Sequence, residues 1–580
     1  MSKIVFICFR NREQDPYTQR DVEVLSESLT PDNIVPSPPL LIKNSGIFAV
    51  LFNPVKSLPV KNSSVCMGNL IEPADDWWKP GAEVPDGSYA LFRSDENRVE
   101  VLTDIVASRT IWYVRTEDMF IASTSQRAIV FFLQDFQPNK ITFSWVLSSG
   151  TLGPGLSWDN RIKHLSGNSR LCLDRSSWEM TVKKEEIGFE PLNVSEKEHE
   201  ARLRKVLEQT YENLNLDYSK WYLALSGGFD SRASLLMLKN KKDLKCVTWG
   251  LKASLDDENN DAYLARALAK HFNLEHKYLA TNISDEPVEK IFNRFLVAGE
   301  GRTVDVAAYM DGLKVWKILF EDGIYGIIRG DHGQGDPVKC LLFFNPRKHC
   351  GAKMLSDYSN LKNIEEDYFG KQVWPENLRR KKKEPLATWY IRLYQDYHMP
   401  FKLAALTDLK CAYVEIVNPL ASGLVTTQIR KMPNNLRLNK VLFSKIVSST
   451  SPEIKFFSGT NANILPENLL KAKQMVKLIR DELDTVYARG LLSDTLVHYI
   501  LCNIKVSQDA LSTKNKKRGK SLVAHFVPEA VKNILRNTVI KERMDCNVLA
   551  FRAYIICKMN QLLTADALAL KQGRRLLDDA

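Results

Sequence analysis

The sequence predicts an α+β N-terminal domain over residues 1–190, arranged as a β-rich sandwich, and an α/β domain with a parallel sheet over residues 191–580. Short apolar runs separated by turns fill the first part, and strands alternate with helical segments in the second. From about residue 380 helical periodicity dominates, which predicts a helical C-terminal part. At about 100 to 200 residues per domain, a chain of 580 residues needs at least two large domains.

Six strand-like runs predict the N-terminal sheets. The boundary near residue 190 follows from Ser195 and Glu198, whose spacing resembles a capping box at the start of a helix. The six predicted strands are Ile47–Phe52, Tyr89–Arg93, Val99–Thr103, Ile111–Arg115, Met119–Ala122 and Arg170–Leu173.

The alternation after residue 220 predicts a parallel sheet with right-handed crossovers. Its predicted strands and helices, in chain order, are Trp221–Leu225, Arg232–Lys239, Leu244–Trp249, Asn260–Asn273 and His276–Leu279. The helices predicted for the C-terminal part are Trp389–Tyr397, Leu403–Glu415, Leu469–Ala488, Thr495–Ala510 and Cys546–Leu563.

Composition excludes several classes of protein. Hydrophobic residues make up 44% and charged residues 26%, so a largely disordered or fibrous chain is excluded. No stretch approaches the roughly 18–20 apolar residues that span a bilayer, so we expect a soluble, cytoplasmic protein without membrane contact. The net charge of +11 permits an anionic ligand but disfavours nucleic acid as a partner. Ten cysteines without a CxxC pair give no zinc ribbon.

The segment from Ser226 to Ser231 reads SGGFDS and carries the clearest chemical signal. It follows the first predicted parallel strand and precedes a helix, which is where α/β sheets bind ligands. Its glycines let the backbone approach an anion, and the helix N-terminus offers free N–H groups. Because Asp230 would repel a bare phosphate, its presence predicts a bridging cation, Mg²⁺.

This loop resembles the pyrophosphate-binding loop of the N-type ATP pyrophosphatases, which activate a carboxylate or carbonyl oxygen as an adenylate and release pyrophosphate. The resemblance implies ATP and Mg²⁺ as ligands, whereas the GxxxxGK[ST] pattern of γ-phosphoryl transfer is absent. The residues that it implies for nucleotide binding are Leu225, Ser226, Gly227, Gly228, Asp230, Ser231, Trp249, Gly250 and Gly330.

A second carboxylate for the metal is implied by the segment that follows the apolar run Gly323–Ile328. This segment, RGDHGQGD, resembles the family's GxGxD motif with about one inserted residue. Two aspartates therefore compete for the metal position. Asp336 is the first choice because it keeps a glycine just before it, and Asp331 is the second.

The N-terminal part narrows the resemblance to the asparagine synthetase family. Pro85–Phe92, Arg109–Tyr113 and Ile162–Asn168 resemble, in order, segments of class II glutamine amidotransferase domains, which have an Ntn-hydrolase fold. Glu415–Leu420 and Met432–Arg437 resemble later motifs of asparagine synthetase. The resemblance covers roughly residues 45–475 and implies an ATP-dependent, AMP-forming ligase that joins a carboxylate, aspartate or a related acid, to ammonia or another amine.

The chain departs from this family at its start. A working glutaminase domain has cysteine directly after the initiator methionine, but here the residue is Ser2, and Cys8 lies inside a predicted strand. We expect a domain without glutaminase activity, although a terminal serine remains a conceivable nucleophile. The nitrogen is then ammonia from solution or from a partner, or an amine of the substrate itself. The sequence also leaves open whether the chain forms a homodimer.

The family uses a lysine to stabilise charge on the departing pyrophosphate, after a Leu-Pro turn. Lys473 in LPENLLKAK fits this layout, and Lys440 is a weaker candidate. Relatives with an inactive glutaminase domain suggest an alternative, an intramolecular ligase that resembles lasso-peptide cyclases or β-lactam synthetases. His332 or Gly333 stands where the β-lactam branch has tyrosine, which disfavours the latter. A tRNA-modifying ATP pyrophosphatase and a non-catalytic scaffold are alternatives from other classes.

Overall fold

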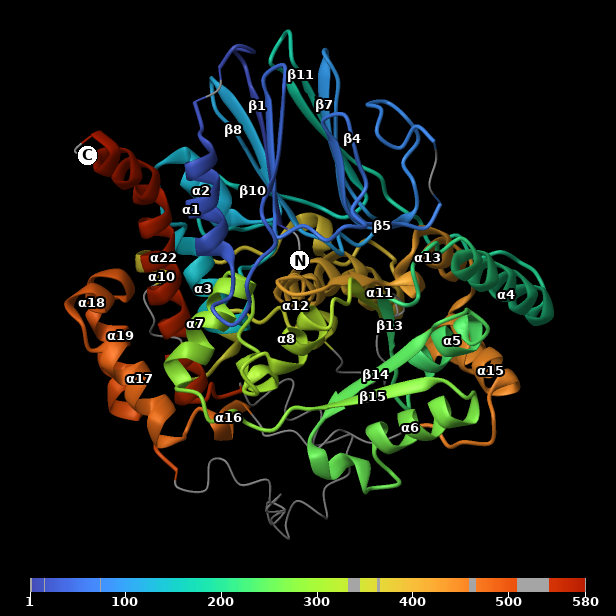
Figure 1. Cartoon of the computed structure of the whole chain (residues 1–580). Helices are drawn as coiled ribbons and strands as arrows, with labels where there is room; N and C mark the ends of the chain where they lie inside the picture. The colour runs from blue at the N-terminus through green and yellow to red at the C-terminus, as the bar shows by residue number, and fades with distance from the viewer. Residues whose placement is uncertain are drawn as a thin grey trace.

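The computed structural model combines two antiparallel sheets, one parallel sheet and a large set of helices (Figure 1). It describes residues 3–14, 16–72, 75–331, 345–361, 366–457, 466–507 and 542–578. Among these residues, no helix has both the length and the apolarity that crossing a membrane requires. Figure 1 shows the antiparallel sheets at the top, the strands β13–β15 at the lower right and the C-terminal helix along the left side.

The two antiparallel sheets each have six strands and pack face to face. The first has the order β10-β8-β9-β1-β3-β2 and the second the order β12-β11-β7-β6-β5-β4. The first comprises β1 (Lys3–Phe9), β2 (Leu40–Asn44), β3 (Ile47–Phe52), β8 (Ile111–Arg115), β9 (Met119–Ser123) and β10 (Lys163–Leu165). The second comprises β4 (Val60–Lys61), β5 (Ser64–Leu70), β6 (Gly87–Ser94), β7 (Arg98–Thr103), β11 (Ser169–Asp174) and β12 (Met180–Lys184). All six predicted strands are confirmed.

The first sheet is covered on both faces, as the buried side chains of strand β1 show. Its seven residues are all buried, and its side chains alternate between two cores. Phe6 faces the second sheet, where its ring stacks on Phe92 at 5.8 Å between centroids. Val5 and Ile7 face the helices α1 (Gln19–Leu29) and α2 (Gln126–Leu133) on the other side.

The predicted parallel sheet is confirmed and has the order β15-β14-β13-β16-β17. Its strands are β13 (Trp221–Ala224), β14 (Lys245–Gly250), β15 (Glu275–Ala280), β16 (Gly326–Ile328) and β17 (Glu415–Val417), and all neighbours are parallel. The helices between them are α5 (Phe229–Leu238), α6 (Asp261–His271), α7 (Val288–Gly299) and α8 (Lys314–Glu321). Since β13 is central, the loop that follows it lies between two neighbouring strand ends.

The helix predicted over Leu403–Glu415 is wrong in its second half. Helix α12 ends at Lys410, and Glu415 begins strand β17, which pairs with β16 at the sheet edge. A three-residue strand depends on its neighbour for hydrogen bonds, so its local sequence does not reveal it.

Other predicted helices have different bounds in the structure. The segment Leu469–Ala488 is divided between two helices, because the Thr485 side chain accepts a hydrogen bond from Ala488 N and caps a new helix. The segment Trp389–Tyr397 passes from an α-helix into a π-helical stretch containing Pro400. The C-terminal helices in the structure are α11 (Leu386–Leu393), η5 (Tyr394–Leu403), α12 (Ala404–Lys410), α17 (Lys473–Leu483), α18 (Val486–Leu492), α19 (Asp494–Asn503) and α22 (Cys546–Asp578).

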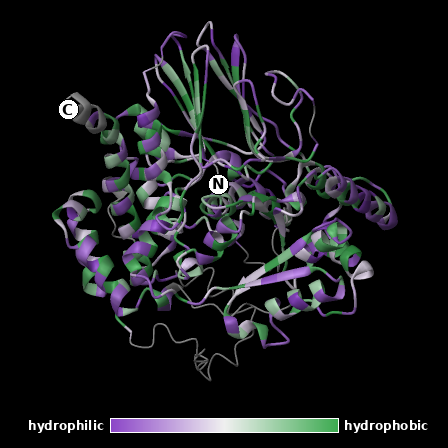
Figure 2. Cartoon of the chain, viewed as in Figure 1, coloured by the Kyte–Doolittle hydropathy of each residue, from purple (hydrophilic) through white to green (hydrophobic). Residues whose placement is uncertain are grey.

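The remaining helices connect these layers. They are α3 (Lys140–Ser149), α4 (Glu196–Glu212), α9 (Pro346–His349), α10 (Glu366–Phe369), α13 (Gly423–Arg430), α14 (Asn434–Arg437), α15 (Val441–Thr450) and α16 (Pro466–Leu469). Short 3₁₀ turns lie at Lys252–Leu255, Val306–Tyr309, Leu355–Asp357, Glu376–Leu378, Pro419–Ala421 and Leu438–Lys440. Figure 2 shows α4 largely in the purple of hydrophilic residues, and its buried residues include Leu203 and Leu207.

The N-terminal and C-terminal parts of the chain share one hydrophobic core. Helix α22 packs along α2, where Arg127 forms two hydrogen bonds with the Asp566 carboxylate at 2.7 and 2.8 Å. A second buried pair joins Lys3 at the start of β1 to Glu300, with Lys3 Nζ 2.6 Å from Glu300 Oε1. The sandwich is therefore fixed to the rest of the chain by charge pairs as well as by apolar contacts.

Candidate functional site

The SGGFDS loop closes on itself between β13 and α5. Ser226 Oγ lies 2.7 Å from Ser231 Oγ, and Ser226 N donates to the same Ser231 oxygen at 3.0 Å. Gly228 N donates to Ser226 Oγ at 3.2 Å, and Gly228 is the N-cap of α5. The loop thus leads directly into a helix N-terminus, whose first N–H groups have no partner within the helix and suit an anion.

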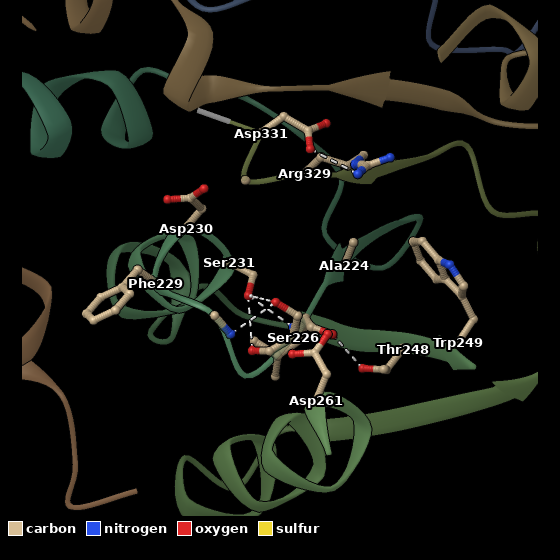
Figure 3. A pocket seen from close by; sticks show the side chains of 13 residues that line it. Ala224, Ser226, Phe229, Asp230, Ser231, Thr248, Trp249, Asp261, Arg329 and Asp331 are labelled. Atoms are coloured by element: carbon tan, nitrogen blue, oxygen red, sulfur yellow. Dashed lines mark hydrogen bonds and ion pairs between the residues drawn. The ribbon is translucent and has the colours of Figure 1, made fainter. Parts of the chain in front are cut away.

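A cavity of about 390 Å³ opens above this loop (Figure 3). It brings together residues from three strand ends and the helices that follow them, as expected for the carboxyl edge of a parallel sheet. In Figure 3, Asp230 and Asp331 lie on the same side of the cavity, with Ser226 and Ser231 below them. The lining residues are Ala224, Leu225, Ser226, Gly228, Phe229, Asp230, Ser231, Thr248, Trp249, Asp261, Arg329, Gly330 and Asp331.

Three carboxylates line this cavity, those of Asp230, Asp261 and Asp331, and the first and last of them each pair with a cation. Asp230 Oδ2 lies 2.6 Å from Lys440 Nζ, and Asp331 Oδ1 lies 2.9 Å from a guanidinium nitrogen of Arg329. Carboxylate oxygens are suitable ligands for Mg²⁺, which is usually bound by one or two carboxylates together with phosphates and waters. The described residues contain no group of three or more histidine, cysteine, aspartate or glutamate side chains that could hold a metal alone. Asp336, the first choice from the sequence, lies outside the described residues.

Gly330 brings the end of β16 against the SGGFDS loop. A Cβ atom at this position would lie 2.7 Å from the carbonyl carbon of Asp230 and 2.8 Å from Ser231 N. Both contacts are with backbone, so only glycine lets the two segments approach this closely. The close approach of these two segments is a steric reason for glycine at a position that the sequence predicts to be part of the nucleotide site.

Neighbouring strands hold the loop in place. Thr248 Oγ1 on β14 donates to the Leu225 carbonyl at 2.7 Å and lies 2.9 Å from His276 Nε2 on β15. Burial lowers the pKa of His276 to about 4, so its ring is neutral at pH 7. From α6, the Asp261 carboxylate accepts the Gly227 N–H at 2.5 Å.

The segment after α15 wraps the outer side of the loop. Phe456 stacks on Phe229 at 4.0 Å between ring centroids, and the guanidinium of Arg232 lies 3.8 Å from the Phe456 ring centroid. Phe457 N donates to the Gly227 carbonyl at 3.0 Å. Because Arg232 also donates to the carbonyls of Ile454 and Lys455, this segment is fixed to the first turn of α5.

A second cavity of about 520 Å³ adjoins the first and shares four lining residues with it, Thr248, Trp249, Asp261 and Arg329. Trp249 and Gly250, both predicted to bind the nucleotide, lie on its wall. The far wall contains Trp316 from α8 and Lys410 from α12. Burial and the nearby Arg329 charge lower the pKa of the Lys410 ammonium to about 7.

The two predicted lysines lie in different places. Lys440 reaches Asp230, as described above. Lys473 is exposed at the first position of α17 and lines neither cavity, although Leu469 in the same segment lines the second one. Ser2 lies outside the described residues, while its neighbour Lys3 is buried against Glu300.

Sequence reasoning missed Arg329, Lys410 and the bond from Asp261 to the loop. Arg329 is the first residue of the RGDHGQGD segment and could have been found there. Lys410 lies in a stretch predicted as helix, where no sequence feature distinguishes it from a surface lysine. No model of a known protein family matches this chain, and a comparison with curated proteins found no match.

Proposed function

We propose that the protein is an asparagine-synthetase-like ligase that activates a carboxylate with ATP, forming AMP and pyrophosphate, and then forms an amide with ammonia or another amine. The observation that carries this proposal is the position of the SGGFDS loop, between the end of the central strand β13 and the start of α5, with the carboxylates of Asp230 and Asp331 on the cavity above it. This arrangement suits a polyphosphate better than a neutral ligand, because backbone N–H groups and a cation-binding carboxylate lie together.

Each part of ATP has a matching region in this proposal. The phosphates lie on Ser226–Ser231, and the adenosine lies against Trp249 and Gly250. Asp230, with Asp331 or Asp336, would hold Mg²⁺, which when bound neutralises charge on the departing pyrophosphate. Lys440 stands beside Asp230 and supplies a positive charge on the same side, where negative charge develops as the α-phosphorus is attacked.

The β-sandwich serves as a scaffold in this account. Lys3 of the sandwich forms a buried ion pair with Glu300. Asp86 accepts hydrogen bonds from the backbone N–H groups of Gly423 and Leu424 at the start of α13. A sandwich attached in this way supports the geometry around the parallel sheet. The amine is then ammonia from solution or from a partner, or a group on the substrate itself.

Exchange of labelled pyrophosphate into ATP tests the proposal. The chain, with ATP, Mg²⁺ and a carboxylate such as aspartate, should catalyse exchange that depends on the carboxylate. Asp230→Asn should abolish the exchange while leaving the folded state intact, since Asp230 is partly exposed. Exchange that is unaffected by Asp230→Asn would contradict the proposed site.

A further inference from the structure

Lys410 is buried and forms no ion pair among the described residues, although the Asp331 charge acts on it without direct contact. Only 7% of the residue is exposed, yet the structure gives its ammonium no hydrogen bond or ion pair in the part of the chain that it describes. Its nearest aromatic neighbour is Trp316, whose ring centroid lies 5.6 Å from Lys410 Nζ. Burial disfavours its charged form, so an anion placed beside Lys410 would restore that form and be bound by it.

The wall around Lys410 indicates what the anion is attached to. Trp316, Tyr309 and Met310 are each at least 95% buried and line the same cavity, and Trp316 packs edge-on against Trp249 at 5.1 Å between centroids. The remaining apolar lining residues are Leu251, Ile283, Ala262, Ala307, Ala308, Val315, Leu406 and Leu469. A ligand that fills this end of the cavity therefore has an apolar body.

The carboxylates on this wall are already engaged. Asp311 accepts the backbone N–H groups of Leu313 and Val315 at the start of α8, and Asp305 accepts the Thr303 hydroxyl at 3.3 Å. Arg329 also lines this cavity, and its charge acts on Lys410. Two cationic side chains, Lys410 and Arg329, thus face the cavity next to Asp331, with which Arg329 forms an ion pair at 2.9 Å.

We propose that Lys410 and Arg329 bind the carboxylate of the acyl substrate, and that this substrate is a carboxylic acid with an apolar body rather than aspartate. The inference rests on the proposed ligase function, because it assigns the acyl group a place beside the nucleotide. An apolar acid in this position presents its carboxylate to the shared boundary of the two cavities and its body to Trp316.

Equilibrium binding to the full chain tests this proposal without turnover. The probes are 3-phenylpropanoate and its neutral amide, titrated in the presence of α,β-methylene-ATP. The acid should bind about tenfold more tightly than the amide or better, because hydrogen bonds between charged groups are stronger than those to a neutral amide. Lys410→Met should remove most of this preference, whereas Lys317→Met, which removes a partly exposed lysine of α8 that pairs with Glu321, should retain it.

Equal affinity for the acid and the amide in the unmodified chain would overturn the proposal, as would a preference that survives Lys410→Met. If aspartate binds more tightly than 3-phenylpropanoate, the inference that the substrate has an apolar body would be overturned. The nucleotide is the other source of anionic charge. The affinity of the Lys410→Met variant for α,β-methylene-ATP should lie within about threefold of that of the unmodified chain, and such binding also shows that the variant folds. A variant that loses nucleotide affinity but keeps the preference for the acid would assign Lys410 to ATP and overturn the proposal.

The two proposals fail in different ways. The predicted binding pattern without carboxylate-dependent pyrophosphate exchange would keep the carboxylate site and overturn the ligase. Exchange with aspartate and no preference for the acid over the amide would keep the ligase and overturn this inference.

Discussion

Lys440 Nζ lies 2.6 Å from Asp230 Oδ2, although the two residues are 210 positions apart in the sequence. The backbone around this lysine is strained, because Asn439 and Lys440 both have left-handed φ angles, of 56° and 58°. Strained backbone of this kind persists where the surrounding structure holds it and is concentrated at functional sites. The pair joins the segment before α15 to the first turn of α5, at the edge of the candidate nucleotide site.

The first prediction compares the two lysines. Lys440→Met should lower the rate of AMP formation by about a hundredfold, because it removes a positive charge beside the pyrophosphate position. Lys473→Met should lower the rate by less than about threefold, since Lys473 is exposed, whereas it is Lys440 that pairs with Asp230. This reverses the order expected from the sequence. Steady-state rates at saturating ATP decide it, and a larger loss in Lys473→Met would restore the sequence-based choice.

The second prediction concerns Gly330. A methyl group at this position would meet the backbone of Asp230 and Ser231 at 2.7 to 2.8 Å, so Gly330→Ala should displace the SGGFDS loop. Nucleotide binding, measured by titration with α,β-methylene-ATP, should weaken by at least about tenfold. Gly490→Ala is the matched control, because nothing lies within 4 Å of a methyl group there. Equal nucleotide affinity in the two variants would show that the close approach at Gly330 is irrelevant to binding.

The third prediction concerns the buried pair of Lys3 and Glu300, whose side chains are 8% and 4% exposed. Lys3→Met leaves the Glu300 carboxylate buried without a direct cation among the described residues, with the Ser125 hydroxyl and the Gln126 N–H as hydrogen-bond donors, so the free energy of unfolding should fall by about 3 kcal/mol. Urea unfolding measures this change.

The pH dependence of that loss has a definite sign. Burial raises the pKa of Glu300, but Lys3 and the hydrogen-bond donors outweigh burial and leave the pKa below its usual value. A depressed pKa stabilises the fold above the unfolded-state pKa of about 4.3, and this stabilisation is lost as the pH falls through the folded-state value. The difference between the unmodified chain and Lys3→Met should therefore shrink in acid. A difference that stays constant between pH 7 and pH 3 would show that the pair is not the cause.

The fourth prediction concerns the nitrogen source. Ser2 replaces the cysteine of a glutaminase, and Cys8 is buried inside β1, where burial raises the pKa of its thiol to about 11. Glutamine should therefore fail as a donor, while ammonium or an amine-bearing substrate supports product formation. Labelled glutamine, assayed for glutamate release, measures this. Release that disappears in Ser2→Ala would identify Ser2 as a nucleophile and contradict the scaffold role.

The layered fold could be predicted from the sequence because its strands carry their own signals. The run before Ser226 is apolar and short, and the strands on either side of it repeat that pattern with helices between them. Strand β17 could not be predicted, since its three residues form a strand only through their pairing with β16. The break at Thr485 also escaped prediction, because the apolar spacing continues across it.

The candidate site could be predicted where a local motif or the family resemblance marks its residues. The SGGFDS loop is local, so its glycines, serines and aspartate were found together. Arg329 and Lys410 come from two other segments and line one cavity only in the folded chain. Lys410 illustrates the limit most clearly: its significance lies in its burial and its lack of an ion pair among the described residues, and neither property is visible in sequence.

The identity of the nucleotide product tests the central claim most directly. The pure chain is incubated with ATP, Mg²⁺, ammonium and a set of carboxylic acids that includes aspartate and 3-phenylpropanoate, and the nucleotides are separated by chromatography. The account predicts AMP and pyrophosphate in equal amounts, dependent on an acid and abolished by Asp230→Ala. ADP and phosphate as the products would contradict it.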